Sequence, residues 1–397
     1  MYLNKDRALR VMEQNNLDAL VATIPKNVGY LSSYFPLGEG TFETFAILPR
    51  SSSIPATLVV GHSTLPGVAA NPTWMPNVIS YEETHWLTIH PQPGIPFDGP
   101  WITAPQFEPE MRRLMKDAHN AGTHDGLKAL AGGLRDLGLE KARLAFDDLH
   151  LAEALKEQHL PDLKATGGRH HLVDIRIVKT PEELGIIRHA AQINEDSIQE
   201  SLKSAREGMQ PAEQMTRYRI AVAERGGLSS VGLPGFSWGG QFDDPLKKGA
   251  LFPVIGVCTY KRYGTDLLRT IVVGPPTPNQ VRLHRAVMGA WSTLDAAIRP
   301  GLNTNDIFSI VRQSFTELGG EGGQLAIYVH GIGLDSYENN HHERQEGFVL
   351  EENMVFCVFM VHMAHQDGGG IFLEEQILVT KDGCKQLFTL PRDLILV

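Results

Sequence analysis

The stretch Val329-His330-Gly331-Ile332-Gly333-Leu334-Asp335 decides how this chain is interpreted. It predicts a strand that ends in a tight turn, because Gly331 and Gly333 allow a close backbone approach that residues with a Cβ resist. Such a turn would hold the imidazole of His330 above the strand end. Taken alone, His330 is equally well explained as a hydrogen-bonded structural histidine.

Two further stretches give His330 a chemical context. Tyr263–Thr270 and Phe372–Thr380 both have the pattern of strands, and they carry Asp266 and Glu374. An Asp, a His and a Glu from three separate strands suit a metal site or an acid–base site. The sequence therefore predicts that these three side chains meet.

Composition limits the class of protein. The chain has 397 residues, which is enough for two domains. A net charge of −10 without a basic block argues against nucleic acid or an anionic membrane as partner. The three cysteines form no disulfide framework, and we find no signal peptide and no apolar run of membrane-spanning length. We therefore expect a cytoplasmic protein.

The chain divides into two predicted domains, 1–170 and 171–397. Short strands and helices alternate in the first, which indicates an α/β layer structure. The second opens on a helix start signal: Thr180 and Glu183 form a capping box, and Pro181 stands at the first helical position.

An internal repeat is predicted in the second domain. Gly208 and Gly301 each precede a helix, and Gly226 and Gly319 each end one. Both pairs are separated by the same number of positions, since 301 − 208 and 319 − 226 are both 93. This spacing predicts a duplicated unit, a central sheet with pseudo-two-fold symmetry, and a site between the halves.

Four stretches of the second domain resemble the pita-bread enzymes, namely the methionine aminopeptidases, Xaa-Pro peptidases and creatinase. They are Arg176–Glu183, Asp266–Thr270, His330–Leu334 and Leu350–Phe356. The likeness extends over nearly the whole chain. It implies an α/β (α+β) fold with a creatinase-like N-terminal domain, a pita-bread catalytic domain, and a homodimer.

The metallopeptidases of this family hold two metal ions with two Asp, one His and two Glu. The resemblance places Asp266, His330 and Glu374 on three of these five positions. Ile255 and Phe359 fall on the other two, and neither side chain can bind a metal. The metal site is therefore expected to be degenerate, with no metal or with one divalent ion (Mn, Zn or Fe) held by the three remaining residues.

Our leading hypothesis is metal-independent hydrolysis of a C–N bond, as the resemblance to creatinase and ectoine hydrolase implies. Two carboxylates beside His330 should raise the pKa of the imidazole, so that it protonates the leaving nitrogen. Glu374 or Asp266 would then activate water. Tyr337, which stands where the family has a second histidine, is a candidate hydrogen-bond donor to an oxyanion.

Other residues are candidates for binding a small cationic or zwitterionic substrate. Trp238 and Phe359 would form aromatic walls. Arg269 is expected either in an ion pair or against the substrate, and His362 either in the pocket or facing solvent. Glu43 falls near the position of a substrate-binding arginine of creatinase, with the opposite charge.

Three alternatives to this hypothesis stay open. The first is a metallopeptidase of Xaa-Pro type with a reduced, single-metal site. The second is a lyase of the dimethylsulfoniopropionate type, a reaction also found in this family. The third is a non-catalytic binding protein on the same fold. Metal analysis of the purified protein separates the first alternative from the leading hypothesis.

Overall fold

The computed structural model describes residues 2–36, 43–82, 109, 113–114, 125–230, 245–320, 325–338, 347–364 and 369–397. It separates into two compact units, Met1–Arg176 and Ile177–Val397. The predicted boundary at 170/171 falls inside helix α7 (Arg169–Arg176), which packs on α1 (Lys5–Gln14) of the first unit. Arg176 donates a hydrogen bond to Asn27 Oδ1 at 2.6 Å, so α7 as a whole belongs to the first unit.

The first unit is built on a six-stranded sheet in the order β4-β3-β2-β1-β5-β6. Its strands are β1 (Ala19–Ala22), β2 (Phe45–Pro49), β3 (Thr57–Gly61), β4 (Asn77–Tyr81), β5 (Arg143–Phe146) and β6 (Lys164–Gly167). Besides α1 and α7, the helices are α2 (Pro25–Ser32), α3 (Leu65–Ala70), α5 (Gly126–Asp136) and α6 (Leu149–Gln158). The central strands β1, β2 and β3 are buried on both faces, as a sheet covered by helices requires.

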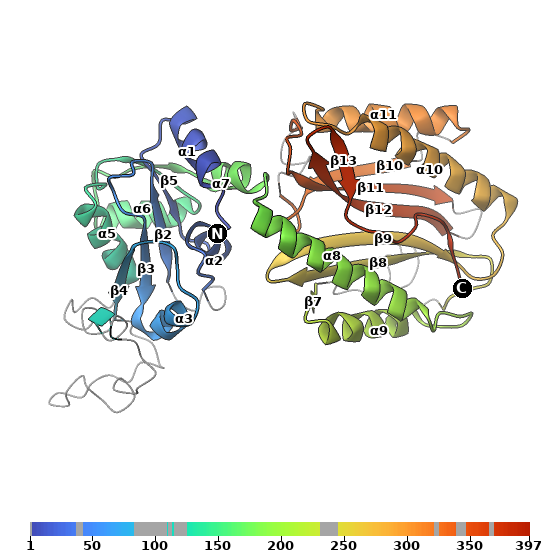
Figure 1. Ribbon diagram of the computed structural model, residues 1–397, viewed down its shortest axis with the longest axis horizontal. Coiled ribbons are helices and arrows are strands. Elements are labelled where there is room, and N and C mark those ends of the chain that lie inside the picture. Colours follow the sequence, from blue (N-terminus) through green and yellow to red (C-terminus); the bar gives the residue numbers. More distant parts are fainter. Residues whose placement is uncertain are drawn as a thin grey trace. The chain divides into compact units, whose positions relative to one another are not determined.

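The second unit is built on an eight-stranded sheet in the order β10-β11-β12-β9-β8-β7, with β13 added on β12 and β14 on β9. The strands are β7 (Leu228–Ser229), β8 (Leu251–Tyr260), β9 (Tyr263–Val272), β10 (Leu325–Gly331), β11 (Val355–Ala364), β12 (Gly369–Thr380), β13 (Gly383–Gln386) and β14 (Ile395–Leu396). Four long strands, β8, β9, β11 and β12, lie side by side through its middle (Figure 1).

Two helix pairs cover one face of this sheet (Figure 1). In the first pair, α8 (Pro181–Leu202) packs on α9 (Pro211–Glu224) and on β8 and β9. In the second, α10 (Pro278–Ala297) packs on α11 (Thr304–Glu317) and on β12, and α11 on β10. Helices α9 and α11 both have 14 residues and begin 93 positions apart, and the glycines that flank them all have positive φ. The predicted repeat therefore corresponds to two matching halves.

Alternation along the strands gives the two faces of this sheet different chemistry. On β11, Phe356, Val358 and Met360 join the core beneath α10 and α11. The residues between them, Cys357 and Phe359, point to the other face. That second face carries the candidate site.

Candidate active site

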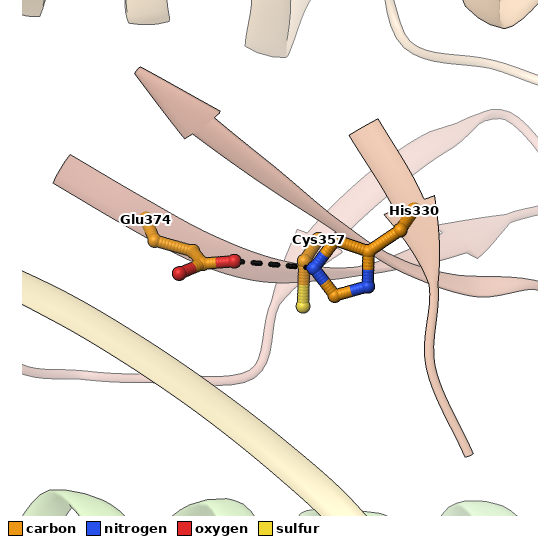
Figure 2. Close-up of side chains that lie close together, drawn as sticks. All are labelled: His330, Cys357 and Glu374. Atoms are coloured by element: carbon orange, nitrogen blue, oxygen red, sulfur yellow. Dashed lines mark hydrogen bonds and ion pairs between the residues drawn. The ribbon is translucent and has the colours of Figure 1, made fainter. Parts of the chain in front are cut away.

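Four side chains meet on the face of the sheet opposite the helices. His330 lies on β10, Cys357 on β11, Glu374 on β12 and Asp266 on β9. The cross-strand register places His330 opposite Cys357 and Glu374 opposite Phe359. Nε2 of His330 lies 3.3 Å from Oε1 of Glu374, as the dashed line in Figure 2 shows. All four side chains are buried.

The glycine turn places His330 as the sequence predicts. An added Cβ on Gly331 would lie 2.3 Å from the carbonyl oxygen of Glu338, and Glu338 N–H donates to Gly331 O at 2.7 Å. Gly264 N–H donates to Gly333 O at 2.7 Å, which ties the turn to β9. The backbone of Glu338 thus leaves no room for a side chain at Gly331, and at Gly333 an added Cβ would lie 2.7 Å from Nζ of Lys179 and 2.9 Å from Oε2 of Glu338.

The hydrogen bonds of His330 define its tautomer. Nδ1 lies 3.1 Å from the carbonyl oxygen of Gly331, which can only accept, so Nδ1 carries the proton. In the neutral ring, Nε2 then presents its lone pair to Glu374. Burial lowers the pKa of His330, and the opposing effect of Asp266 is smaller. Our prediction that the carboxylates hold this ring cationic was therefore wrong, because desolvation outweighs their attraction.

Burial acts on the carboxyl groups in the opposite direction. It raises the pKa of Glu374 from 4.5 to about 8. The pKa of Asp266 is raised well above its ordinary value, by burial first and by the charge of Glu374 second. Without a bound cation, burial therefore favours the protonated form of both carboxyl groups.

Tyr337 lies beside the cluster. Its ring centroid is 4.5 Å from that of His330, and its side chain is 53% exposed. Burial of the hydroxyl, followed by the charges of Asp266 and Glu374, raises its pKa to about 12. The group is therefore a proton-bearing donor at neutral pH, and its role toward an oxyanion stays a prediction.

The family's two-metal ligand set does not fit this site. The resemblance places Ile255 and Phe359 at two of its five ligand positions. Both pack with an apolar group on the site face, whose other members are Leu268, Val361, Phe372 and Met363. Hydrocarbon therefore occupies the space where a second ion would need oxygen ligands.

Cys357 is the member of the cluster that sequence reasoning missed. Its Sγ, one nitrogen of His330 and one oxygen of Glu374 all lie within 4.8 Å of one another (Figure 2). The sequence did indicate its place in the site, because Cys357 stands two residues before Phe359 and the two side chains therefore lie on the same face of a strand.

Arg269 is a structural residue: the ion pair predicted for it is confirmed, and the alternative, a contact with substrate, is wrong. Its side chain is fully buried and forms an ion pair with Glu375 at 2.5 Å. It also donates to the carbonyl oxygens of Leu390 and Pro391, both at 2.9 Å. These bonds lie on the helix side of the sheet, because Arg269 is three residues beyond Asp266 and therefore faces the other way.

His362 is also on the helix side, so its predicted place in the pocket is wrong. Its ring lies 5.4 Å from that of Phe315 on α11. Glu43 is an exposed residue of the first unit, and its side chain lies against Gly126. Contacts of Glu43 and Phe359 with a substrate stay predictions. Trp238 lies outside the described residues.

Comparison with known proteins agrees with this geometry. The profile of Metallopeptidase family M24 matches residues 185–381. The Xaa-Pro dipeptidase of Pyrococcus horikoshii is 27% identical over 283 residues, which are 68% of this chain and 77% of that protein. The Xaa-Pro dipeptidase of Pyrococcus furiosus is 27% identical over 231 residues, which are 56% of this chain and 66% of that protein.

Solved structures agree on the fold. The prolidase of Pyrococcus horikoshii OT3 superposes with a TM-score of 0.72 at 21% identity, over 98% of this chain and 99% of that one. The Xaa-Pro dipeptidase of Bacillus anthracis superposes with a TM-score of 0.74 at 19% identity, over 99% and 98%.

The chain belongs to the creatinase and Xaa-Pro peptidase superfamily. Its fold is the pita-bread fold with an N-terminal domain, as predicted. Among the described residues, no helix is long and apolar enough to cross a membrane.

Proposed function

We propose that this protein hydrolyses the C–N bond of a short peptide of Xaa-Pro type, on a reduced site that holds a single metal ion. The observation that carries the proposal is the buried cluster around His330 and Glu374, in a domain whose relatives include Xaa-Pro dipeptidases. It replaces metal-independent hydrolysis as our leading hypothesis.

The donor set fits one divalent ion. The neutral His330 ring and the Glu374 carboxylate direct a nitrogen and an oxygen at each other, and Asp266 lies beside them. An ion at this place would act as a Lewis acid that polarises the scissile carbonyl. The protein's own contribution is to orient these donors from three strands and to exclude water by burial.

The test is hydrolysis of Xaa-Pro dipeptides compared with matched Xaa-Ala dipeptides, before and after removal of metal by a chelator. We expect turnover of the Xaa-Pro series, loss of activity on chelation and recovery with one equivalent of metal. Glu374→Gln should lower kcat/KM by roughly 10²–10⁴-fold. Cys384→Ser removes a thiol outside the cluster and serves as the matched control. Failure of every Xaa-Pro dipeptide to react would contradict the substrate class.

Metal-independent C–N hydrolysis is the second candidate function. The apolar residues Ile255 and Phe359 at two ligand positions favour it. The pKa of Glu374, at about 8, leaves a protonated carboxyl at neutral pH that could donate to a leaving nitrogen. Activity that survives exhaustive chelation, with no metal found in the protein, would select this candidate.

A further inference from the structure

We propose that Cys357 is a metal ligand, and that His330, Cys357 and Glu374 form a mononuclear zinc site with thiolate ligation. This inference rests on the proposed function for its catalytic meaning, although its test does not. It departs from the all-nitrogen-and-oxygen ligand set that the resemblance implies, since it adds a sulfur ligand and removes the second ion.

Strand geometry brings the three donors together. His330 and Cys357 are direct cross-strand partners on β10 and β11, and Glu374 lies on the next strand, β12. Their donor atoms lie within 4.8 Å of one another, and the side chains come from three adjacent antiparallel strands (Figure 2). Each donor is thus held by a strand of the same sheet.

The orientation of the donors indicates a cation. Nδ1 of His330 is committed to the carbonyl oxygen of Gly331, so the lone pair of Nε2 faces an oxygen of Glu374 at 3.3 Å. Zinc bonds of about 2.0–2.2 Å to nitrogen and oxygen, at tetrahedral angles, place two such ligand atoms about 3.3–3.6 Å apart. The separation therefore already matches two ligands of one ion.

A second observation points the same way. Oδ1 of Asp266 is buried and has no hydrogen-bond partner in the described part of the chain. A buried polar atom without a partner carries a desolvation cost that a cation would remove. The charge of Glu374 acts on Asp266, so the two side chains are close, although Asp266 is not among the three residues whose donor atoms converge.

The sulfur selects the ion. Thiolate favours zinc over the harder manganese and magnesium ions, which prefer carboxylate and water. One thiolate and one carboxylate also balance the two positive charges of Zn²⁺ beside a neutral imidazole. The apolar group that contains Ile255 and Phe359 excludes a second ion. One ion with three protein ligands is left. Three ligands and an open position are the arrangement of catalytic zinc.

The experiment is metal binding to the purified full chain, without substrate. Apoprotein prepared with a chelator is reloaded with Zn²⁺ or Co²⁺, and the metal content is measured by mass spectrometry. We expect one ion per chain and, with Co²⁺, a near-ultraviolet charge-transfer band from sulfur to cobalt. Cys357→Ser should abolish this band and weaken zinc binding by at least the roughly 10–100-fold that changes around a metal site cost. The control Cys384→Ser, whose thiol points to the carbonyl oxygen of Asp295, should keep both.

Zinc X-ray absorption of the unmutated protein provides a readout that does not depend on folding of the variant. We expect one sulfur neighbour at about 2.3 Å. Two ions per chain, a zinc shell with only nitrogen and oxygen, or an unchanged cobalt band in Cys357→Ser would each overturn the inference. A sulfur-ligated zinc in a protein that cleaves no Xaa-Pro dipeptide would contradict the proposed function and leave the site intact.

Discussion

Single side chains in this protein are assigned to their roles by the face of the strand on which they stand. Asp266 and Arg269 lie three positions apart on β9 and therefore face opposite sides of the sheet. One takes part in the buried cluster, and the other forms an ion pair with Glu375 beneath the helices. A charged residue next to a motif can therefore be assigned to substrate binding only after its position along the strand shows which face of the sheet it is on.

The Arg269–Glu375 pair gives a stability prediction. Arg269→Met removes one partner of a fully buried ion pair, which leaves Glu375 with Arg392 as its remaining charged partner at 3.2 Å. Breaking such pairs costs roughly 3–5 kcal/mol, and urea unfolding should show a loss of this size. Arg217→Met is the control, because its pair with Glu213 is exposed and its loss should change the unfolding free energy little. If Arg269→Met lowered the unfolding free energy only slightly and raised KM, the result would indicate that Arg269 binds the substrate.

Glu183 gives a prediction of pH dependence. Burial raises its pKa from 4.5 to about 7, although the charge of Lys179 opposes the shift. The folded state therefore holds a proton that the unfolded state has lost between pH 4.5 and 7. The contribution of this proton to the unfolding free energy is complete below pH 4.5. It is lost as the pH rises to about 7, a change of about 3 kcal/mol.

Glu183→Gln cannot lose this proton. Its unfolding free energy, relative to that of the unmutated protein, should therefore rise by about 3 kcal/mol between pH 4.5 and 7. Denaturant titrations at a series of pH values measure this difference. Parallel curves for the two proteins would show that Glu183 ionises in the folded state as it does in the unfolded chain.

Helices of the second unit begin at signals that are local in the sequence. Thr180 starts α8 and Thr277 starts α10, each with a capping box and with Pro at the first position. The Thr180 signal was identified from sequence and is confirmed. The equivalent box at Thr277 has Gln280 in place of Glu, and its hydrogen bonds are 3.2 Å and 2.8 Å long.

Thr277→Ala should therefore destabilise the protein by about 1 kcal/mol, since the backbone N–H of Gln280 loses its acceptor, the Thr277 hydroxyl. The control is Thr216→Ala within α9, where an exposed hydroxyl bonds only to the carbonyl oxygen of Ala212. We expect it to stay within about 0.5 kcal/mol of the unmutated protein. Equal losses in both variants, measured by urea unfolding, would show that the cap contributes nothing specific.

At the scale of the whole molecule, each unit has its own hydrophobic core. The first is centred on β1, β2 and β5, and the second on β10, β11 and β12. A ligand that binds only the folded second unit stabilises it by about 2.7 kcal/mol at a concentration 100 times its Kd. A metal ion at the cluster should act in this way.

We therefore expect zinc to slow amide hydrogen exchange in β10, β11 and β12 and to leave β1 and β2 unchanged. Hydrogen-exchange mass spectrometry with and without metal measures this effect. His330→Ala removes a ligand and should abolish the protection. Equal protection of both units, or protection that survives in His330→Ala, would show that zinc binds elsewhere.

The sequence by itself determined the elements, the two-unit organisation, the repeat and the meeting of Asp266, His330 and Glu374. These features depend on local signals, namely helix caps, glycines at positive φ and the residue patterns of strands, which involve only residues close together in the chain. The absence of two carboxylates at Ile255 and Phe359 was also visible in the sequence.

Only the tertiary structure decided the membership and the electrostatics of the cluster. Cys357 joins it because the register of β10 on β11 places that thiol opposite His330, and register depends on the whole sheet. The pKa of His330 falls because burial outweighs its charged neighbours. Alternate residues of a strand point to opposite faces of the sheet. Arg269 and His362 therefore face the helices, whereas Asp266 and Phe359 face the site.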